Sequence, residues 1–303
     1  MKHINILIIF LLLFITSNMQ AQSASDIVTK IMEKNQNQVV LTIDDSRILE
    51  YPVDDIINAL NIYRNSNSKN ERFIVQSIAY KLFLNNDSDL VRKYTVDMLI
   101  DDFTFNEALI RQQASKKLLY FNKYDFNNSH KEKVKFYLED APVHGLIPVL
   151  GVMHFEESKP YLLDIISKGD KSLKAKDWFT SNAWMAHLAL ARMGEKENVQ
   201  YCIDRFYAET NKINKITRLL KDMAYIQNKR TMDILVKVAN SEKRLPSTKG
   251  GRHGALYAGY AIEQILKSVK NPPIKPVGSG YTKDQIDLVR DWCSKRNNLK
   301  IKR

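Results

Sequence analysis

The residues of this chain best suited to do chemistry are lysines and arginines in its last third. Lys212, Lys215, Arg218 and Lys221 follow one another at three-residue steps in a segment with a helical pattern. Such spacing places them along a winding ridge on the exposed side of that helix. Cations gathered on one surface attract phosphate or carboxylate groups. The spacing therefore predicts a surface that binds an anionic partner.

A second basic group lies in the glycine-rich stretch 241–254. It comprises Lys243, Arg244, Lys249 and Arg252. Glycines in the same stretch let a backbone come close to a ligand, and the free amides at the beginning of the next helix favour anions. The stretch is not a P-loop, because the required lysine–hydroxyl ending is missing. These four residues are therefore further candidates for anion binding.

The charge of the chain is distributed unevenly. The whole sequence has a formal net charge of +12, from 46 basic and 34 acidic residues. Residues 211–303 contain 21 Lys or Arg and 7 Asp or Glu, a net charge of +14, whereas residues 1–210 have a net charge of −2. A solvated surface is the simpler interpretation. So strong an asymmetry favours an anionic partner.

Catalytic and metal-binding patterns are missing from the sequence. His144, His154 and His187 form no pair at the i, i+4 spacing of helical metal ligands, and no HExxH motif occurs. His187 falls on an apolar helix face, so we expect a hydrogen-bonded core histidine there. Gly278-Ser279-Gly280 lacks the strand–turn–helix context of a nucleophile elbow. We therefore predict no catalytic residue, no metal and no cofactor.

The elements that must position the basic residues are helices arranged in repeated pairs. The segment Asn182–Phe206 predicts two helices joined by a tight turn at Gly194. The apolar face of the second helix recurs 33 residues later, and such units bury their faces by stacking on copies. The apolar positions that recur are Val199, Cys202, Ile203 and Phe206, then Met232, Leu235, Val236 and Ala239. The helical segments predicted in this region are 71–84, 88–101, 106–121, 130–140, 143–153, 157–168, 177–193, 196–208, 212–226 and 229–241.

Three of these segments carry a resemblance to a known repeat family. Leu90-Val91-Arg92 and Leu109-Ile110-Arg111 resemble the valine–arginine helix of HEAT-type repeats. Leu188–Met193 followed by Gly194-Glu195 is similar to the helix–Gly–acid–helix turn of short HEAT-like repeats. The resemblance implies an all-α, right-handed α–α superhelix. It also implies a binding scaffold, since this family is mostly made of such proteins.

The predicted organisation has four parts. A signal peptide at residues 1–21 precedes an N-terminal capping segment at 22–70 and HEAT-like repeats at 71–241. A basic, atypical helical cap follows at 242–303, with helices at Ala255–Val269 and Thr282–Arg296.

Export is predicted from the beginning of the chain. Lys2 and His3 precede an unbroken apolar run at Ile6–Ile15, and Ala21 offers a small residue for cleavage. The run is too short to span a bilayer, which takes about 20 apolar residues, and no later run is longer. We expect a periplasmic or secreted protein.

The expected partner of such an exported scaffold is a protein, or an anionic polymer or headgroup of the envelope. An enzyme with its active site in the concave groove of the superhelix is an alternative. A HEAT-like nucleic-acid binder is a second alternative, against which the signal peptide counts.

Three smaller expectations concern packing. Cys202 and Cys293 lie two to three repeat units apart, so we predict free, mostly buried thiols. Pro148 should kink or shorten the helix in which it lies. The aromatic residues expected to pack in the interior rather than line a groove are Trp178, Trp184, Trp292, Tyr257 and Tyr260.

The signal-peptide assignment predicts that export depends on Ile6–Ile15. Replacing two residues of this run with arginine should trap the protein in the cytoplasm, because charged residues prevent the apolar segment from engaging the export machinery. Cell fractionation and immunoblotting measure this. Unchanged export of the variant would contradict the assignment.

Overall fold

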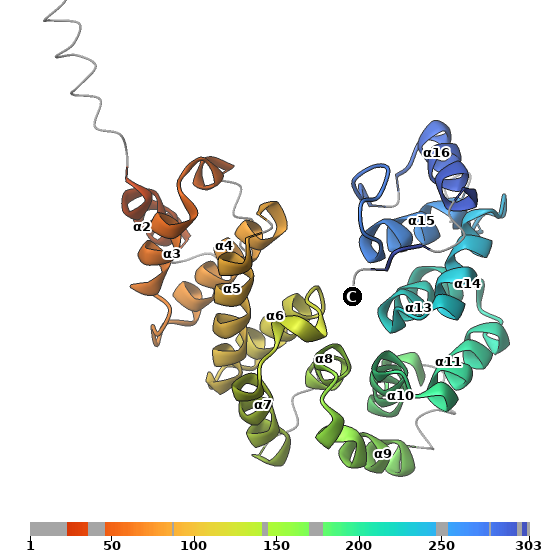
Figure 1. The fold of residues 1–303 in the computed structure, drawn as a ribbon, viewed down its shortest axis with the longest axis horizontal. Coiled ribbons are helices and arrows are strands. Elements are labelled where there is room, and N and C mark those ends of the chain that lie inside the picture. The colour runs from red at the N-terminus through yellow and green to blue at the C-terminus, as the bar shows by residue number, and fades with distance from the viewer. Residues whose placement is uncertain are drawn as a thin grey trace, which may run out of the picture. The chain divides into compact units, whose positions relative to one another are not determined.

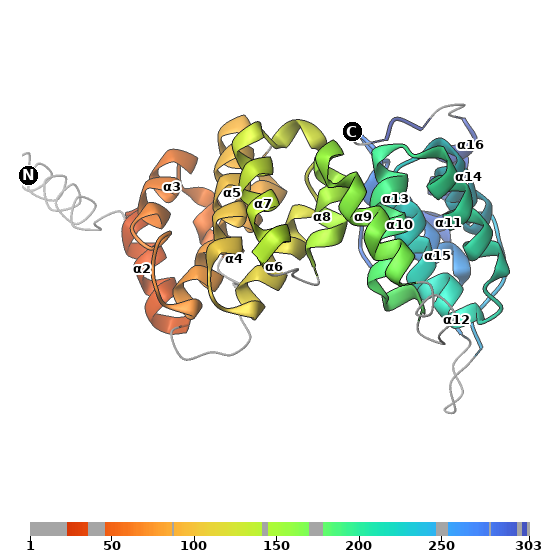
Figure 2. The same cartoon turned by 90° about the horizontal axis from the view of Figure 1, so that it is seen from below.

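The computed structural model describes residues 23–35, 46–86, 88–140, 145–169, 178–246, 254–278, 280–295 and 299–301 (Figures 1 and 2). The predicted signal peptide lies outside the described residues, as do His144, Lys249 and Arg252. The regular elements of the described residues are all helices, with two isolated β-bridges and no strand among them. The all-α fold class is therefore confirmed.

The chain divides into two compact units, and the division falls within α6. The first unit runs to Ile110, and in it α2 contacts α3 and α4, α3 contacts α4 and α5, and α4 contacts α5. Its elements are α2 (Ala24–Asn35), η1 (Ser46–Glu50), α3 (Val53–Asn61), α4 (Lys69–Asn85), α5 (Asp89–Asp101), η2 (Asp102–Thr104) and the first turn of α6 (Ala108–Leu118).

A buried carboxylate fixes the connections of the first unit. Asp102, which directly follows α5, accepts hydrogen bonds from Arg72 Nη1 at 2.7 Å and from Gln76 Nε2 at 2.6 Å. The same guanidinium donates through Nε to the Ser66 carbonyl at 2.7 Å. Buried charge is tolerated when it is paired and hydrogen-bonded in this way. The network holds α4 to both the connection before it and the turn after α5.

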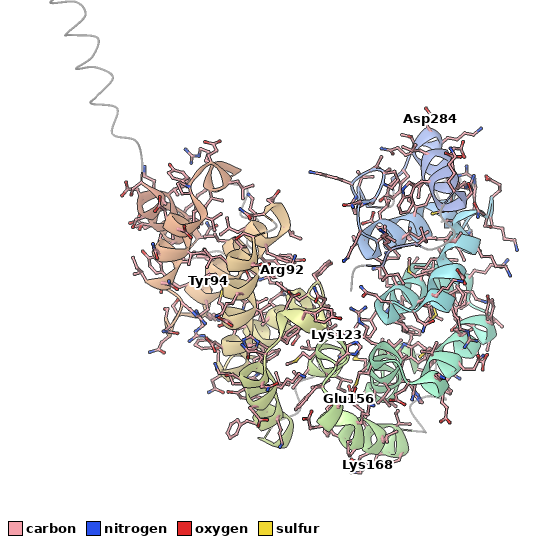
Figure 3. All side chains as sticks on the ribbon, viewed as in Figure 1. Arg92, Tyr94, Lys123, Glu156, Lys168 and Asp284 are labelled. Carbon is pink, nitrogen blue, oxygen red and sulfur yellow. The ribbon has the colours of Figure 1, made fainter. Side chains whose placement is uncertain are left out.

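Tyr94 lies on α5 next to this network (Figure 3). The Arg64 guanidinium lies 5.5 Å from the centre of its ring and pairs with Asp101 at 2.5 Å. Burial of the Tyr94 hydroxyl raises its pKa to about 12. This side chain is therefore a neutral packing residue of the first unit.

The second unit begins at Arg111 and contains the rest of the described helices. In this unit α10 contacts α8, α9, α11 and α13, and α14 contacts α13, α15 and α16. Its α-helices are α7 (Asn128–Asp140), α8 (Leu146–Met153), α9 (Lys159–Lys168), α10 (Asn182–Met193), α11 (Lys196–Ala208), α12 (Lys212–Asn214), α13 (Leu220–Ile226), α14 (Lys229–Ala239), α15 (Tyr257–Ser268) and α16 (Lys283–Ser294). Short 3-10 turns η3 (Lys123–Asp125), η4 (Glu156–Ser158) and η6 (Trp178–Thr180) and a π-helical segment, η7 (Lys215–Leu219), complete it.

Three helices of the second unit end in the same way. The residue that closes α8, α10 or α13 has a left-handed backbone, with φ of 48° at His154, 103° at Gly194 and 51° at Gln227. Such a residue satisfies the last carbonyls of a helix and turns the chain sharply. In each case another helix follows, namely α9, α11 or α14. The helix–turn–helix unit predicted around Gly194 therefore occurs three times among the described residues, with non-glycine residues at two of the turns.

The predicted apolar faces are buried. Val199, Cys202, Ile203 and Phe206 of α11 are buried, as are three of their four counterparts on α14, with Val236 half-buried. Trp184 is fully buried at 0% exposure. Both thiols are free and buried, as predicted.

Several helix boundaries differ from the predicted ones, and two helices begin three or more residues later than predicted. The helix predicted at 143–153 begins at Leu146, so Pro148 lies in its first turn. Backbone N–H groups of the first turn have no acceptor within the helix, so proline loses no hydrogen bond there. The expected shortening is confirmed. The helix predicted at 177–193 begins only at Asn182, because the Ser181 side chain accepts from Trp184 N at 3.2 Å and caps it.

A buried contact joins α8, α10 and α13, which lie side by side in Figure 1. The Tyr225 hydroxyl donates to the Pro148 carbonyl, and Arg192 Nη1 donates to the Tyr225 carbonyl at 2.7 Å. The hydroxyl lies where a side chain at Gly151 would be, and a Cβ added there would also lie 2.7 Å from Ala189 Cα. Only glycine at position 151 allows these helices to come so close.

We therefore predict that Gly151→Ala destabilises the protein. The added methyl group meets both the Tyr225 hydroxyl and the α10 backbone, and overpacking of this kind costs about 1–3 kcal/mol. Thermal unfolding followed by circular dichroism should show a midpoint lower by several degrees. Gly280→Ala is the matched control, because its added Cβ meets nothing within 4 Å. Equal midpoints for the two variants would contradict the packing argument.

Candidate functional site: the basic surface of the second unit

The first group of predicted basic residues lies on a helix with a changed register. The segment predicted as one helix at 212–226 consists of α12, the π-helical η7 and α13. A π-helical turn closes i→i+5 hydrogen bonds and inserts an extra residue, so three-residue steps no longer follow a regular ridge. Lys212, Arg218 and Lys221 are exposed, whereas Lys215 is half-buried. The predicted four-residue ridge is therefore interrupted at Lys215.

Lys215 is engaged within the protein. Its Nζ donates to the Tyr207 carbonyl at 3.1 Å and to the Glu209 carbonyl at 3.0 Å, at the end of α11. It also lies 5.3 Å from the centre of the Phe206 ring. Cations stabilise the carbonyl end of a helix, and burial lowers the pKa of this ammonium group. Lys215 is therefore a positioning residue that holds α12 against α11.

Arg218 is exposed but held in place. Its guanidinium lies 4.8 Å from the centre of the Phe179 ring, and the neighbouring Arg205 lies 4.0 Å from that of Trp178. The Trp178 ring meets Trp184 edge-on at 4.6 Å. Two arginines from different elements thus hold the η6 turn, a role that no local sequence signal reveals. A guanidinium fixed on an aromatic ring keeps its donor edges available for an anion.

The second basic group lies in the connection between α14 and α15, where two backbone hydrogen bonds join the two ends of that connection. Leu245 N donates to the Ala255 carbonyl at 3.0 Å, and Tyr257 N donates to the Lys243 carbonyl at 2.9 Å. Lys243 and Arg244 are exposed beside this pairing, and Arg244 Nη1 donates to the Gly254 carbonyl at 3.2 Å.

Gly254 has a different role from the one expected. A Cβ at this position would collide with the Leu245 carbonyl. The glycine therefore allows two chain segments to approach each other, where the sequence suggested close approach to a ligand. Lys249 and Arg252, the other members of this group, lie outside the described residues.

Most lysines of residues 211–301 that the structure describes have no carboxylate partner among the described residues. In the described part of residues 211–301, the ion pairs are Lys267 with Glu263, Arg290 with Glu242 and Asp287, and Lys295 with Asp291. The other described lysines of this range form no ion pair with a described residue. All of them are exposed except Lys215, which is half-buried. The exposed, unpaired lysines are Lys212, Lys221, Lys229, Lys237, Lys243, Lys270, Lys275, Lys283 and Lys300.

One carboxyl group in this unit has an unusual environment. Trp184 Nε1 donates to Asp222 Oδ2 at 2.9 Å, and burial raises the pKa of this carboxyl to about 7. The Cys202 thiol nearby has a pKa raised well above its ordinary value, so it stays protonated and unreactive. Tyr225, the third group here, also has a raised pKa. These three groups are therefore mostly uncharged below about pH 7.

The histidines have structural surroundings. His187 Nδ1 forms a hydrogen bond of 2.7 Å with Asn198 Oδ1, and its ring stacks on Tyr201 at 4.0 Å. The side chain is half-buried, and burial lowers its pKa. His154 closes α8, and burial lowers its pKa to about 4. No cluster of metal-ligating side chains occurs among the described residues.

Among the residues that the structure describes, no helix has the length and apolar character needed to cross a membrane. The chain matched no protein-family model, no curated protein and no solved structure in the comparisons made.

We predict that Asp222 makes stability depend on pH. Its pKa is higher in the folded state, at about 7, than the ordinary value of 3.8, so folding favours the protonated form. Ionisation of Asp222 therefore lowers the free energy of unfolding. This loss is absent below about pH 4, grows as the pH rises to about 7 and is constant above, with a size on the order of 2–4 kcal/mol. Asp222→Asn removes it, so the variant should gain stability relative to the parent between pH 4 and pH 8.

Urea unfolding at several pH values measures this difference. Asp233→Asn, an exposed site on α14, is the control. A stability difference between Asp222→Asn and the parent that stays constant with pH would contradict the assigned pKa.

Proposed function

We propose that this protein is an exported HEAT-like helical-repeat scaffold that binds an anionic partner through the basic surface of its second unit. The observation that carries the proposal is the set of exposed lysines without carboxylate partners among the described residues. The +14 net charge of residues 211–303 already counts every carboxylate in that range, so ion pairs within the range do not reduce it. A surface of this kind attracts anions over a range set by ionic strength.

The positions most suited to direct contact are those with defined geometry. Arg218 is held on Phe179, and Lys212 and Lys221 are exposed on the adjoining turns of α12 and α13. Arginine contributes a planar fork that matches phosphate or carboxylate oxygens, and the lysines add mobile positive charge. Lys243 and Arg244 form a second contact group at the base of their connection. Lys215 supports the first group from within.

The partner class follows from this chemistry. Clustered phosphate or carboxylate groups occur on envelope polymers, on lipid headgroups and on acidic proteins, and each satisfies the same cations. Nucleic acid also carries phosphates, and binding to it is an outcome that the experiment must separate. The repeat architecture supports a scaffold, because stacked helix pairs present an extended surface.

The test is charge reversal on the surface. The triple variant Lys212→Glu, Arg218→Glu and Lys221→Glu should bind dextran sulfate at least tenfold more weakly than the parent at low salt. The same should hold for reversal of Lys243, Arg244, Lys249 and Arg252. Parent binding should weaken steeply with salt, because exposed charges are screened over about 10 Å at 0.1 M. Biolayer interferometry across a salt series measures both effects.

The matched control reverses three exposed lysines of the first unit, Lys30, Lys34 and Lys69. It changes the net charge by the same amount as the triple variant and should bind nearly as well as the parent. If all variants lose affinity equally, net charge alone governs binding and the site is not localised. If none loses affinity, the basic surface is only a solvated exterior. Tighter binding to duplex DNA than to dextran sulfate would favour a nucleic-acid partner.

A further inference from the structure

We infer that the corner between α11 and α12 inserts into the headgroup region of an anionic lipid surface. The corner comprises Tyr207, Lys212, Ile213, Lys215 and Lys237. This inference rests on the proposed anion-binding function and names the class of partner. The observation behind it is that Tyr207, Ile213, Lys212 and Lys237 are exposed on segments around the half-buried Lys215.

The apolar part of the corner is exposed to solvent. Tyr207 and Ile213 are each 52% exposed, although the adjacent Phe206 is buried at 3%. Tyr207 follows Phe206, the last residue of the buried face of α11, and Ile213 lies in the three-residue helix α12. Asn211 fixes that short helix, because its side chain accepts from Ile213 N at 3.0 Å and from Asn214 N at 3.2 Å. The corner is therefore an ordered projection.

Cations lie close to Tyr207 and next to Ile213 in the chain. Lys237 Nζ, from α14, lies 6.0 Å from the centre of the Tyr207 ring, and Lys215 Nζ donates to the Tyr207 carbonyl. Lys212 is exposed directly beside Ile213 in the chain. Tyrosine and lysine side chains place an apolar body at depth and a polar end in the headgroup region. The arrangement is that of an interfacial anchor.

Three carboxylates lie near the corner. Glu209 Oε1 accepts from Asn211 N at 2.7 Å, so this carboxylate is engaged by the turn itself. Asp233 is exposed one turn before Lys237 on α14, and Asp204 is exposed one turn before Tyr207 on α11, where it accepts from Gln200 Nε2 at 2.6 Å. The positive charge that attracts an anionic surface therefore comes from the +14 excess of residues 211–303 as a whole.

The exposed apolar side chains distinguish a lipid surface from a soluble polyanion as the anionic partner. A sulfated or phosphorylated polymer in water satisfies the lysines but gains little from contact with Ile213. A lipid surface satisfies both, because its phosphates meet the lysines while its acyl boundary receives the aliphatic side chain. The observations therefore favour a lipid headgroup surface over a soluble polyanion.

The experiment compares lipid and polymer binding by the same variants of the full mature chain. Binding to vesicles of phosphatidylglycerol and phosphatidylcholine in equal parts is measured by co-sedimentation, and binding to dextran sulfate by interferometry. Ile213→Ser and Tyr207→Ser should lower vesicle partitioning at least fivefold and leave dextran sulfate binding within twofold of the parent. Leu288→Ser, at a 47% exposed site on α16, is the control and should change neither.

A spectroscopic arm reports insertion directly. Ile213→Trp should show a blue-shifted emission difference from the parent on these vesicles and quenching by brominated acyl chains. Pure phosphatidylcholine vesicles should produce neither change. Circular dichroism confirms that each variant keeps its helix content.

The outcomes separate the two proposals. If charge reversal abolishes vesicle binding while Ile213→Ser and Tyr207→Ser bind as the parent does, the insertion is wrong and the anion-binding function stands. An equal loss of vesicle and dextran sulfate binding in the two serine variants also overturns insertion. A parent that binds dextran sulfate but no anionic vesicle overturns the lipid assignment. A parent that binds neither overturns both proposals.

Discussion

The second unit depends on the close approach of α8, α10 and α13 at Gly151. The Tyr225 hydroxyl occupies the space that a side chain at this position would take, and it reaches the Pro148 carbonyl of α8. Arg192 then joins α10 to the end of α13. Buried polar groups persist only where each finds a partner, so this network requires one relative placement of the three helices. That placement determines where the connections after the helices emerge.

The position of the basic surface follows from which faces of these helices are buried and which are exposed to water. Each helix buries an apolar stripe, and the opposite face stays in water whatever charge it carries. In the structure, these cations have different partners and therefore different roles. Lys215 and Arg290 are bound to backbone carbonyls, and Lys267 and Lys295 are paired with carboxylates. The remaining exposed lysines have no such task within the described residues, which is why the proposed function rests on them.

Much of the helical framework was predictable, because apolar periodicity reflects burial directly. The helices predicted at 88–101 and 196–208 occur as α5 (Asp89–Asp101) and α11 (Lys196–Ala208), within one residue at each end. The π-helical segment at Lys215 was not predictable, since its extra residue is stabilised by contacts of Lys215 with α11. The candidate site was predicted as a set of residues, while its geometry was not. The Arg218–Phe179 and Lys237–Tyr207 contacts join residues 30 or more positions apart in sequence.

The sequence by itself determined the all-helical fold, the repeated helix pairs, the buried faces and the concentration of positive charge in residues 211–303. These properties are local or compositional, so they can be read from spacing and residue type. Only the tertiary structure decided that Lys215 supports the site from within, that Gly254 accommodates Leu245, and that Tyr207 and Ile213 are exposed among lysines. The physical reason is that exposure and partnership depend on which segments pack together, and segments distant in sequence supply those contacts.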